Sequence, residues 1–413
     1  MTLPAVPTVT IRFGPGATFG PILSLGSPTQ GKLGEAVLGT AASEYVNITN
    51  VQRIAIRRGR DRVLDTYSAG TATIQFLDMT GLWNPTNTSS YGTKIKPFNQ
   101  IQIQATYSST NYQLFTGYVS SWDYDWQPGT GVSQVTIQAI DAFRLFGLAN
   151  ITTVTGATTG EAPGTRLGKI LDQVNWPSTY RDIDTGNVTL QADPGTERTV
   201  LDAAQALEAA ELGAFFVGGN GKATFLSRSE IANISSQPLA SIAQFRDTTG
   251  SYARYQTIDV SYDDNDLANV VSVSRQGGTT QTVSNTASVL EYYQRSLSRT
   301  GLLLQTDAQA LNQANMILNY RDEIKQVVQS ISTDLSHDSV TAATCLDLEL
   351  NDPVYVVRTP ISGPAIALRV SVQNISHDIT PATWRTTIGT AVPLATAFVL
   401  GSTEFGILGT STL

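Results

Sequence analysis

The segment Val119-Ser-Ser-Trp-Asp-Tyr-Asp-Trp-Gln-Pro128 recurs in weaker form 253 residues later, as Val372-Gln-Asn-Ile-Ser-His-Asp-Ile-Thr-Pro381. Its valine, second aspartate and proline are identical, and at the same offset Ile101-Gln-Ile103 falls on Val354-Tyr-Val356. These segments alternate apolar and polar residues, as half-buried antiparallel strands do. Because they recur in the same order, the sequence predicts two related β-units within one chain.

The surrounding sequence extends this prediction. Thr136-Ile137 matches Thr387-Ile388 once the second turn is shortened by two residues. Further alternating runs, at Ile54 and Ile56 and at Ala72, Ile74 and Phe76, predict more strands in the first unit. Residues 78–97 lie between predicted strands as a loop of about 20 residues, a length typical of loops that contact a partner.

The remaining segments differ in character. Residues 1–48 are rich in Gly, Pro and Thr, so we expect an irregular N-terminal arm that packs on something larger. Residues 151–240 mix helical spacing with a hairpin and predict an α+β insert, in which Thr199 caps a helix that stops at Gly213. A capping box at Thr306 and Gln309 predicts a later helix.

Composition narrows the function classes. The chain has 413 residues, 15% of them charged, and a net charge of −8, which disfavours a duplex-binding domain held by phosphate neutralisation. One cysteine, Cys345, excludes an intrachain disulfide, and with two histidines it excludes a four-ligand Cys/His zinc site. The start of the chain lacks a signal-peptide pattern, and no apolar run is long enough for a membrane span. We therefore expect a chain made in a cytoplasm.

Candidate catalytic groups are weak. Ser336-His337-Asp338 and Ser376-His377-Asp378 hold the residue types of a hydrolase triad, but neighbours on a strand point to opposite faces, so they predict structural positions instead. Asp263-Asp-Asn-Asp266 lacks the EF-hand spacing and predicts a solvated turn. Cys345 predicts a small buried hydrophobe. The sequence therefore predicts no catalytic, cofactor-binding or metal site.

One charge cluster stands out in the chain. It consists of Arg53, Arg57, Arg58, Arg60 and Arg62. Such a cluster grips either phosphate or an acidic protein neighbour, and on an acidic chain the second reading, a subunit contact, is favoured. We expect Arg57, Arg58, Arg60, Arg62 and Trp83 at a subunit interface.

A family resemblance accompanies these patterns. It rests on Arg58-Gly-Arg60, Ala69-Gly70-Thr-Ala-Thr-Ile-Gln-Phe-Leu-Asp78, Trp83-Asn-Pro85-Thr-Asn87, Lys96-Pro97 and Leu114-Phe-Thr-Gly117-Tyr-Val-Ser-Ser-Trp122, in that order. Together they resemble the N-terminal region of siphophage minor tail proteins of the tail-hub kind. Later segments, including Asn351-Asp-Pro-Val354-Tyr-Val, extend the resemblance over about residues 50–392. Tyr293-Gln294-Arg295 departs from the Tyr-Gly-Arg turn expected of the family.

The resemblance implies a mainly β fold, with two tail-tube-like antiparallel barrel or sandwich domains flanking a small α+β domain. The boundaries that we expect are an arm at 1–48, a first β-domain at 49–150, an insert at 151–240, a hub region ending in a second β-domain at 241–395, and a docking tail at 396–413. It implies a non-enzymatic virion protein without cofactors, assembled in the host cytoplasm and located at the tail tip.

The implied function is a homotrimeric hub that adapts a six-fold tail tube to a three-fold tip and lets DNA pass during ejection. Expected partners are the tube or distal tail protein above, tip, fibre or central spike proteins below, and the tape measure protein. Three alternatives stay open: a hexameric distal tail protein, a carbohydrate-binding or host-receptor module using Trp122, Tyr124 and Trp126, and a β-rich glycosidase.

Overall fold

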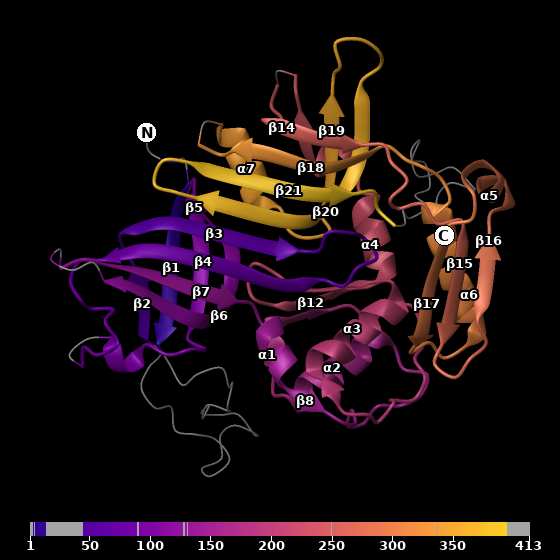
Figure 1. Ribbon diagram of the computed structural model, residues 1–413, viewed down its shortest axis with the longest axis horizontal. Helices are drawn as coiled ribbons and strands as arrows, with labels where there is room; N and C mark the ends of the chain where they lie inside the picture. Colours follow the sequence, from indigo (N-terminus) through magenta and orange to yellow (C-terminus); the bar gives the residue numbers. More distant parts are fainter. Residues whose placement is uncertain are drawn as a thin grey trace.

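The computed structural model describes residues 3, 5–13, 44–88, 91–126, 129, 131–248, 250–336 and 338–394. Its main feature is a 13-stranded, mostly antiparallel sheet that runs through both predicted β-units (Figure 1). The strands of this sheet are β1 (Val6–Phe13), β2 (Glu44–Ile48), β3 (Val51–Gly59), β4 (Ser68–Asp78), β5 (Gln100–Tyr107), β6 (Thr110–Trp126), β7 (Ser133–Ile140), β13 (Ala243–Arg246), β14 (Thr257–Ser261), β18 (Val327–Asp334), β19 (Pro353–Arg358), β20 (Ile366–Ile379) and β21 (Trp384–Ala391). The fold class is therefore the predicted one, mainly β.

Smaller elements lie beside this sheet (Figure 1). Between β7 and β13 come α1 (Phe143–Leu148), β8 (Asn150–Ile151), α2 (Pro163–Gln173), β9 (Arg181–Ile183), β10 (Arg198–Thr199), α3 (Val200–Glu211), β11 (Ala214–Val217), β12 (Ala223–Leu226) and α4 (Arg228–Ser235). Between β14 and β19 come β15 (Val270–Arg275), β16 (Gln281–Ser284), α5 (Thr286–Tyr292), β17 (Ser296–Leu302), α6 (Asp307–Arg321) and α7 (Ser339–Asp347). Short 3-10 turns span Gly92–Lys94, Ser178–Tyr180 and Leu239–Ser241.

Strand alternation gives the main sheet one buried and one polar face. Ile54 pairs with Ile74, and Ile74 with Ile137, across β3, β4 and β7, and each of these side chains is at most 1% exposed. On the opposite face Arg53 lies beside Gln75, which leaves that face open to solvent. The side chains of the buried face belong to one hydrophobic core, which also contains residues of β1, of β5 and of the helices.

The predicted helix caps are confirmed, with one correction. The side chain of Thr199 accepts from the amide of Asp202, and Thr306 and Gln309 form a capping box. The first helix does not stop at Gly213, because the left-handed residue at its end is Leu212, with φ of 54°. Leu212 is 6% exposed, and burial of its side chain offsets the cost of this conformation.

The expectation of an irregular arm is wrong where the arm is described. Val6–Phe13 pairs with β5 on one side and with Glu44–Ile48 on the other, so these residues form part of the first β-unit. Val9 and Ile11 reach its core, at 1% and 0% exposed. The rest of the arm and the predicted docking tail at 396–413 lie outside the described residues.

The long loop after β4 packs on its own sheet. Asp78 accepts hydrogen bonds from the amides of Thr80 and Trp83, which turns the chain inward. The Trp83 ring lies 5.3 Å from that of Phe76 and 6.0 Å from that of Trp122, and Trp83 is 6% exposed. In a single chain Trp83 therefore anchors the loop.

No helix in the described part of the chain combines the length and the apolar character that crossing a membrane requires.

Candidate functional site

The main sheet consists of two halves that have the same strand order. In the first half the order is β3-β4-β7-β6, with β5 on the other edge of β6; in the second half it is β14-β18-β21-β20, with β19 on the corresponding edge of β20. Figure 1 shows these eight strands as one row from β14 to β6. The predicted duplication is therefore present in the strand order itself.

The pairing register is also repeated. Ile101 pairs with Gly117 and Ile103 with Phe115 in the first half. At the offset of the sequence repeat, Val354 pairs with Val370 and Val356 with Leu368. Because a slip of one residue would turn every side chain to the opposite face, an identical register means that both halves bury the same positions.

Two irregularities recur at matching positions. The register shifts between Val119 and Ser121 in the β6–β7 pair, and between Val372 and Asn374 in the β20–β21 pair. Phe98 and Asn351, the residues that lead into β5 and β19, have φ of 70° and 71°, and each donates its amide to the valine that precedes the bulge, at 2.8 Å. Shared bulges and shared left-handed residues indicate one ancestral unit more strongly than alternation does.

The two halves join through β20 and β3. Residues 366–371 of β20 pair with β19, while residues 374–379 continue along the same edge and pair with β3. On the buried face Ile379 lies opposite Ile54, and both are at most 2% exposed. On the open face Arg53 and Asp378 form a bidentate ion pair, with Nε to Oδ1 at 2.8 Å. We call this contact the internal junction.

The structure divides the predicted arginine cluster. Arg57 and Arg62 are exposed, and Arg57 pairs with Asp61 on the surface. Arg58 is 5% exposed and donates to Glu349 at 2.6 Å, and the same carboxylate accepts the amide of Gly219. Arg58 thus ties the first half to the second half and to the insert. An interface role for Arg57 and Arg62 stays a prediction.

Arg60 is buried where three parts of the chain meet. It donates to Gln373 at 2.8 Å and to the carbonyl of Asp65 at 3.0 Å, and its guanidinium lies 4.3 Å from the centre of the Tyr67 ring. The carboxylate of Glu208, from α3, lies 3.8 Å away. Burial raises the pKa of Glu208 to about 7, although Arg60 opposes that shift. The side chains of Arg60 and Trp83 are therefore buried in contacts within the single chain.

The Ser376-His377-Asp378 segment is structural, as predicted. His377 is 3% exposed and lies 2.9 Å from the hydroxyl of Thr386, and its Nδ1 accepts from the indole of Trp384. Asp378 points to the other face, toward Arg53. In the other segment, His337 lies outside the described residues.

His377 gives the fold a dependence on pH. Burial, and secondarily Arg58, lowers its pKa from 6.5 to about 3, so the stability it contributes is present above pH 6.5 and is lost as pH falls. Between pH 7 and pH 5 the wild type should lose about 2 kcal/mol more unfolding free energy than His377→Gln, at ~1.4 kcal/mol per pKa unit. Urea unfolding at the two pH values measures this difference, since buried carboxyls affect both proteins alike. Equal losses would contradict a buried neutral imidazole.

The other residues considered as candidate chemical groups have structural surroundings. Cys345 is 2% exposed inside α7, and burial raises its thiol pKa. Asp263 accepts the amide of Asn265 in an exposed turn, as the solvated-turn prediction requires. Among the described residues no group of His, Cys, Asp and Glu side chains is arranged to hold a metal ion.

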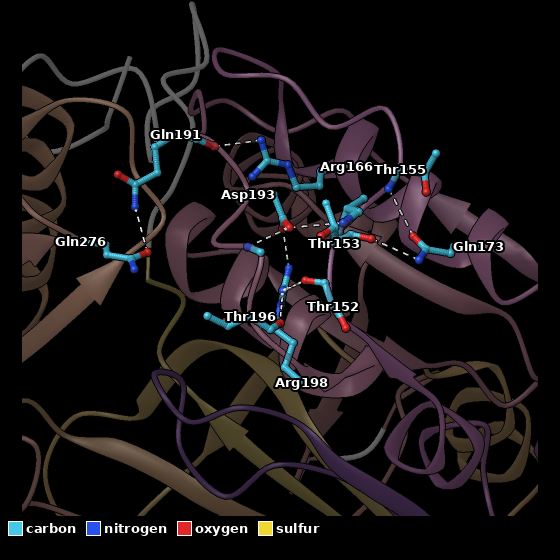
Figure 2. A network of polar contacts seen from close by, with 12 residues as sticks. Thr152, Thr153, Thr155, Arg166, Gln173, Gln191, Asp193, Thr196, Arg198 and Gln276 are labelled. Carbon is cyan, nitrogen blue, oxygen red and sulfur yellow. Dashed lines mark hydrogen bonds and ion pairs between the residues drawn. The ribbon is translucent and has the colours of Figure 1, made fainter.

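The insert carries a dense polar network (Figure 2). Asp193 accepts the amides of Val154 and Gly195 and pairs with Arg198, which donates to the carbonyl of Thr196 at 2.8 Å. Gln191 reaches from this network to Gln276, in the turn that follows β15, at 3.2 Å. These contacts fix loops of the insert and attach it to the neighbouring sheet.

Sequence reasoning missed the internal junction. Asp378 and Arg53 are 325 residues apart, so no local pattern connects them. One signal was present: alternation in residues 374–379 continues past the point where β19 ends, which leaves part of β20 in need of another partner.

The architecture is a duplicated β-unit with an α+β insert, and similarity to known proteins appears at the level of the fold. No family model matches the chain, and no curated protein matches it in sequence. A tail protein from Neisseria meningitidis MC58 has a TM-score of 0.55 at 11% identity, with 84% of this chain and 93% of that chain covered. The 43 kDa tail protein of prophage MuSo2 from Shewanella oneidensis has a TM-score of 0.52 at 13% identity, covering 86% and 97%. A chain of a PdpA–VgrG complex has a TM-score of 0.50 at 11% identity, covering 94% and 65%. The chain therefore shares its fold with these two tail proteins and with the chain of the PdpA–VgrG complex.

Proposed function

We propose that this chain is a structural phage tail protein, three copies of which form a ring at the distal end of the tail. The observation that carries the proposal is the duplication of the β-unit in a single chain, with strand order, register and bulges preserved. Three chains would supply six β-units. Such a ring offers quasi-six-fold symmetry to the tube while keeping three-fold symmetry toward the tip.

The open face of the sheet suits a channel through which DNA slides. It is lined largely by hydroxyl and amide side chains, such as Thr73, Gln138 and Thr387. Its aspartates, including Asp123 and Asp125, are exposed, whereas Arg53 is neutralised by Asp378. A polar, weakly negative lining repels the phosphate backbone and gives it few cations to bind.

The remaining expectations belong to this proposal. Its partners would be the tail tube or distal tail protein on one side and tip, fibre or central spike proteins on the other, and its location the virion tail tip. The siphophage hub assignment rests on the sequence resemblance. We propose no enzymatic activity, and cell-wall hydrolysis by the purified protein would contradict that.

The distal tail protein is the main alternative. Six copies of a single β-unit would already match a six-fold tube, so the duplication favours three copies. A sugar-binding platform is less well supported, because Trp122 stacks on Trp83 and donates to the carbonyl of Lys96.

Rotational symmetry tests the proposal. Single-particle cryo-electron images of the assembled protein, or of the particle tip, should show three-fold rings with six β-lobes around an opening. Mass photometry should give three times the chain mass of 44.2 kDa. Six chains per ring would move the assignment to the distal tail protein, and a monomer in the virion would overturn the ring.

A further inference from the structure

We infer that the ring closes by strand pairing between copies: residues 121–126 of β6 in one chain pair with β14 of the next chain. The inference rests on the proposed ring and names the surface that builds it. Its template is the internal junction, in which the equivalent segment of β20 pairs with β3.

Both partner edges are open in a single chain. One edge of β6 pairs with β5 as far as Tyr118. Val119 continues along this edge with backbone hydrogen bonds to Phe98 and Asn99. Beyond that point no described strand pairs with this edge. β14 pairs with β18 alone among the described strands. Open edges are rows of unpaired amides and carbonyls, and they invite a further strand. In Figure 1 the two edges lie at opposite ends of the eight-strand row, so pairing them joins copies head to tail.

The repeat fixes the register of this pairing. Ile54, Ile74 and Ile137 form a row across β3, β4 and β7. The second half has the matching row of Ile258, Ile331 and Ile388 across β14, β18 and β21. Ile258 is thus the counterpart of Ile54.

Since Ile379 faces Ile54 at the internal junction, its counterpart Trp126 should face Ile258 of the next copy. On the open face, Asp125 then lies opposite Asp259.

Side-chain exposure agrees with a missing partner. At the internal junction Ile54, His377 and Ile379 are at most 3% exposed. At the open edges Trp126, the counterpart of Ile379, is 56% exposed, and Ile258 and Tyr124, the counterparts of Ile54 and His377, are only half-buried. Positions that are buried at the junction within the chain are therefore less covered at the edges where the second copy would pack.

The open face predicts that the junction between copies is the weaker of the two. Thr257 stands at the position of Arg53, so Asp125 lacks the ion pair that its counterpart Asp378 makes. Asp125 also faces Asp259, and like charges directly opposite destabilise a strand pair. Assembly of the ring is therefore separable from folding of the chain.

Engineered cysteines test the register. Directly opposed residues have Cα atoms about 4.5–5.5 Å apart, within the range a disulfide bridges, whereas a shift of two residues places them at about 7–8 Å. Asp125→Cys with Asp259→Cys should give covalent dimers and trimers on a non-reducing gel after oxidation at high protein concentration. Asp123→Cys with Asp259→Cys, the shifted pair, and each single variant should not.

A positive control lies inside the chain. Asp378→Cys with Ala55→Cys occupies the matching pair of the internal junction and should form an intrachain bond in the monomer. Light scattering shows whether trimers form. If they do, and the control pair forms its disulfide while the Asp125→Cys/Asp259→Cys pair does not, the inferred junction is wrong and the proposed ring still stands. If the chain never assembles, the ring and the junction both fail.

A second measurement avoids cysteine. Thr257→Arg rebuilds at the open edge the cation that Arg53 provides inside the chain, so it should tighten assembly by about fivefold per junction, as a cross-strand ion pair of ~1 kcal/mol would. Thr257→Glu should weaken assembly. Unchanged association in both variants, measured by sedimentation, would overturn the inference.

Discussion

Alanine at Gly59 should lower the free energy of unfolding by about 3 kcal/mol or more, because it forces a side chain into the internal junction. Gly59 has φ of 118°, where residues with a Cβ are strained. An added Cβ would lie 2.2 Å from the carbonyl oxygen of Gln373 and 2.5 Å from the Cα of Asn374. Both are backbone atoms, so the strands must separate. Urea denaturation of Gly59→Ala measures the loss.

Gly81→Ala is the matched control. Gly81 also has a positive φ, 70°, but an added Cβ there meets no atom within 4 Å. It should cost about 1–2 kcal/mol, the left-handed strain alone. If the two variants lose equal stability, close packing of β3 against β20 is not what Gly59 provides.

The sequence predicted the two related β-units because the same pattern of alternating apolar and polar residues occurs in both. Val119 and Val372 mark the same bulge, and the alternation around them fixes which face is buried. Strands β1 and β2 were missed because Gly- and Pro-rich residues surround two short apolar runs. The first run becomes a strand on the edge that β5 offers, and the second on the edge that β1 then offers.

The candidate interface was predicted less well than the fold. A run of arginines in a sequence suggests exposed charge, yet Arg58 and Arg60 are buried by partners 291 and 313 residues away, Glu349 and Gln373. Trp83 likewise folds back onto its own sheet. Long-range pairing of this kind leaves no local pattern, whereas the repeat does identify the two open edges once the internal junction is seen.

The buried cluster around Arg60 gives the other large expected effect. Arg60→Met should cost about 3–5 kcal/mol of unfolding free energy at pH 8, because it removes the ion-pair partner of the buried Glu208 carboxylate and leaves Arg299 as the other cation that lowers its pKa. It also removes the donor to Gln373. Thermal and urea unfolding at several pH values measure the cost, and Arg57→Met is the matched control. Arg57 is a neighbouring arginine whose side chain is 67% exposed and whose loss should cost under about 0.5 kcal/mol.

The cost of Arg60→Met should fall with pH, and the direction follows from Glu208. Its pKa in the folded protein is about 7, above the usual 4.5, so lowering the pH through this range protonates the folded state first and favours folding. Without Arg60 the pKa rises further, and at pH 5.5 the carboxyl is neutral in the folded variant. The variant should therefore recover part of its lost stability between pH 8 and pH 5.5, relative to the wild type. Glu208→Gln in the Arg60→Met background should abolish that recovery, since it removes the titrating group. A loss that is the same at both pH values would show that the cost comes from lost packing on Tyr67 and not from an unpaired charge.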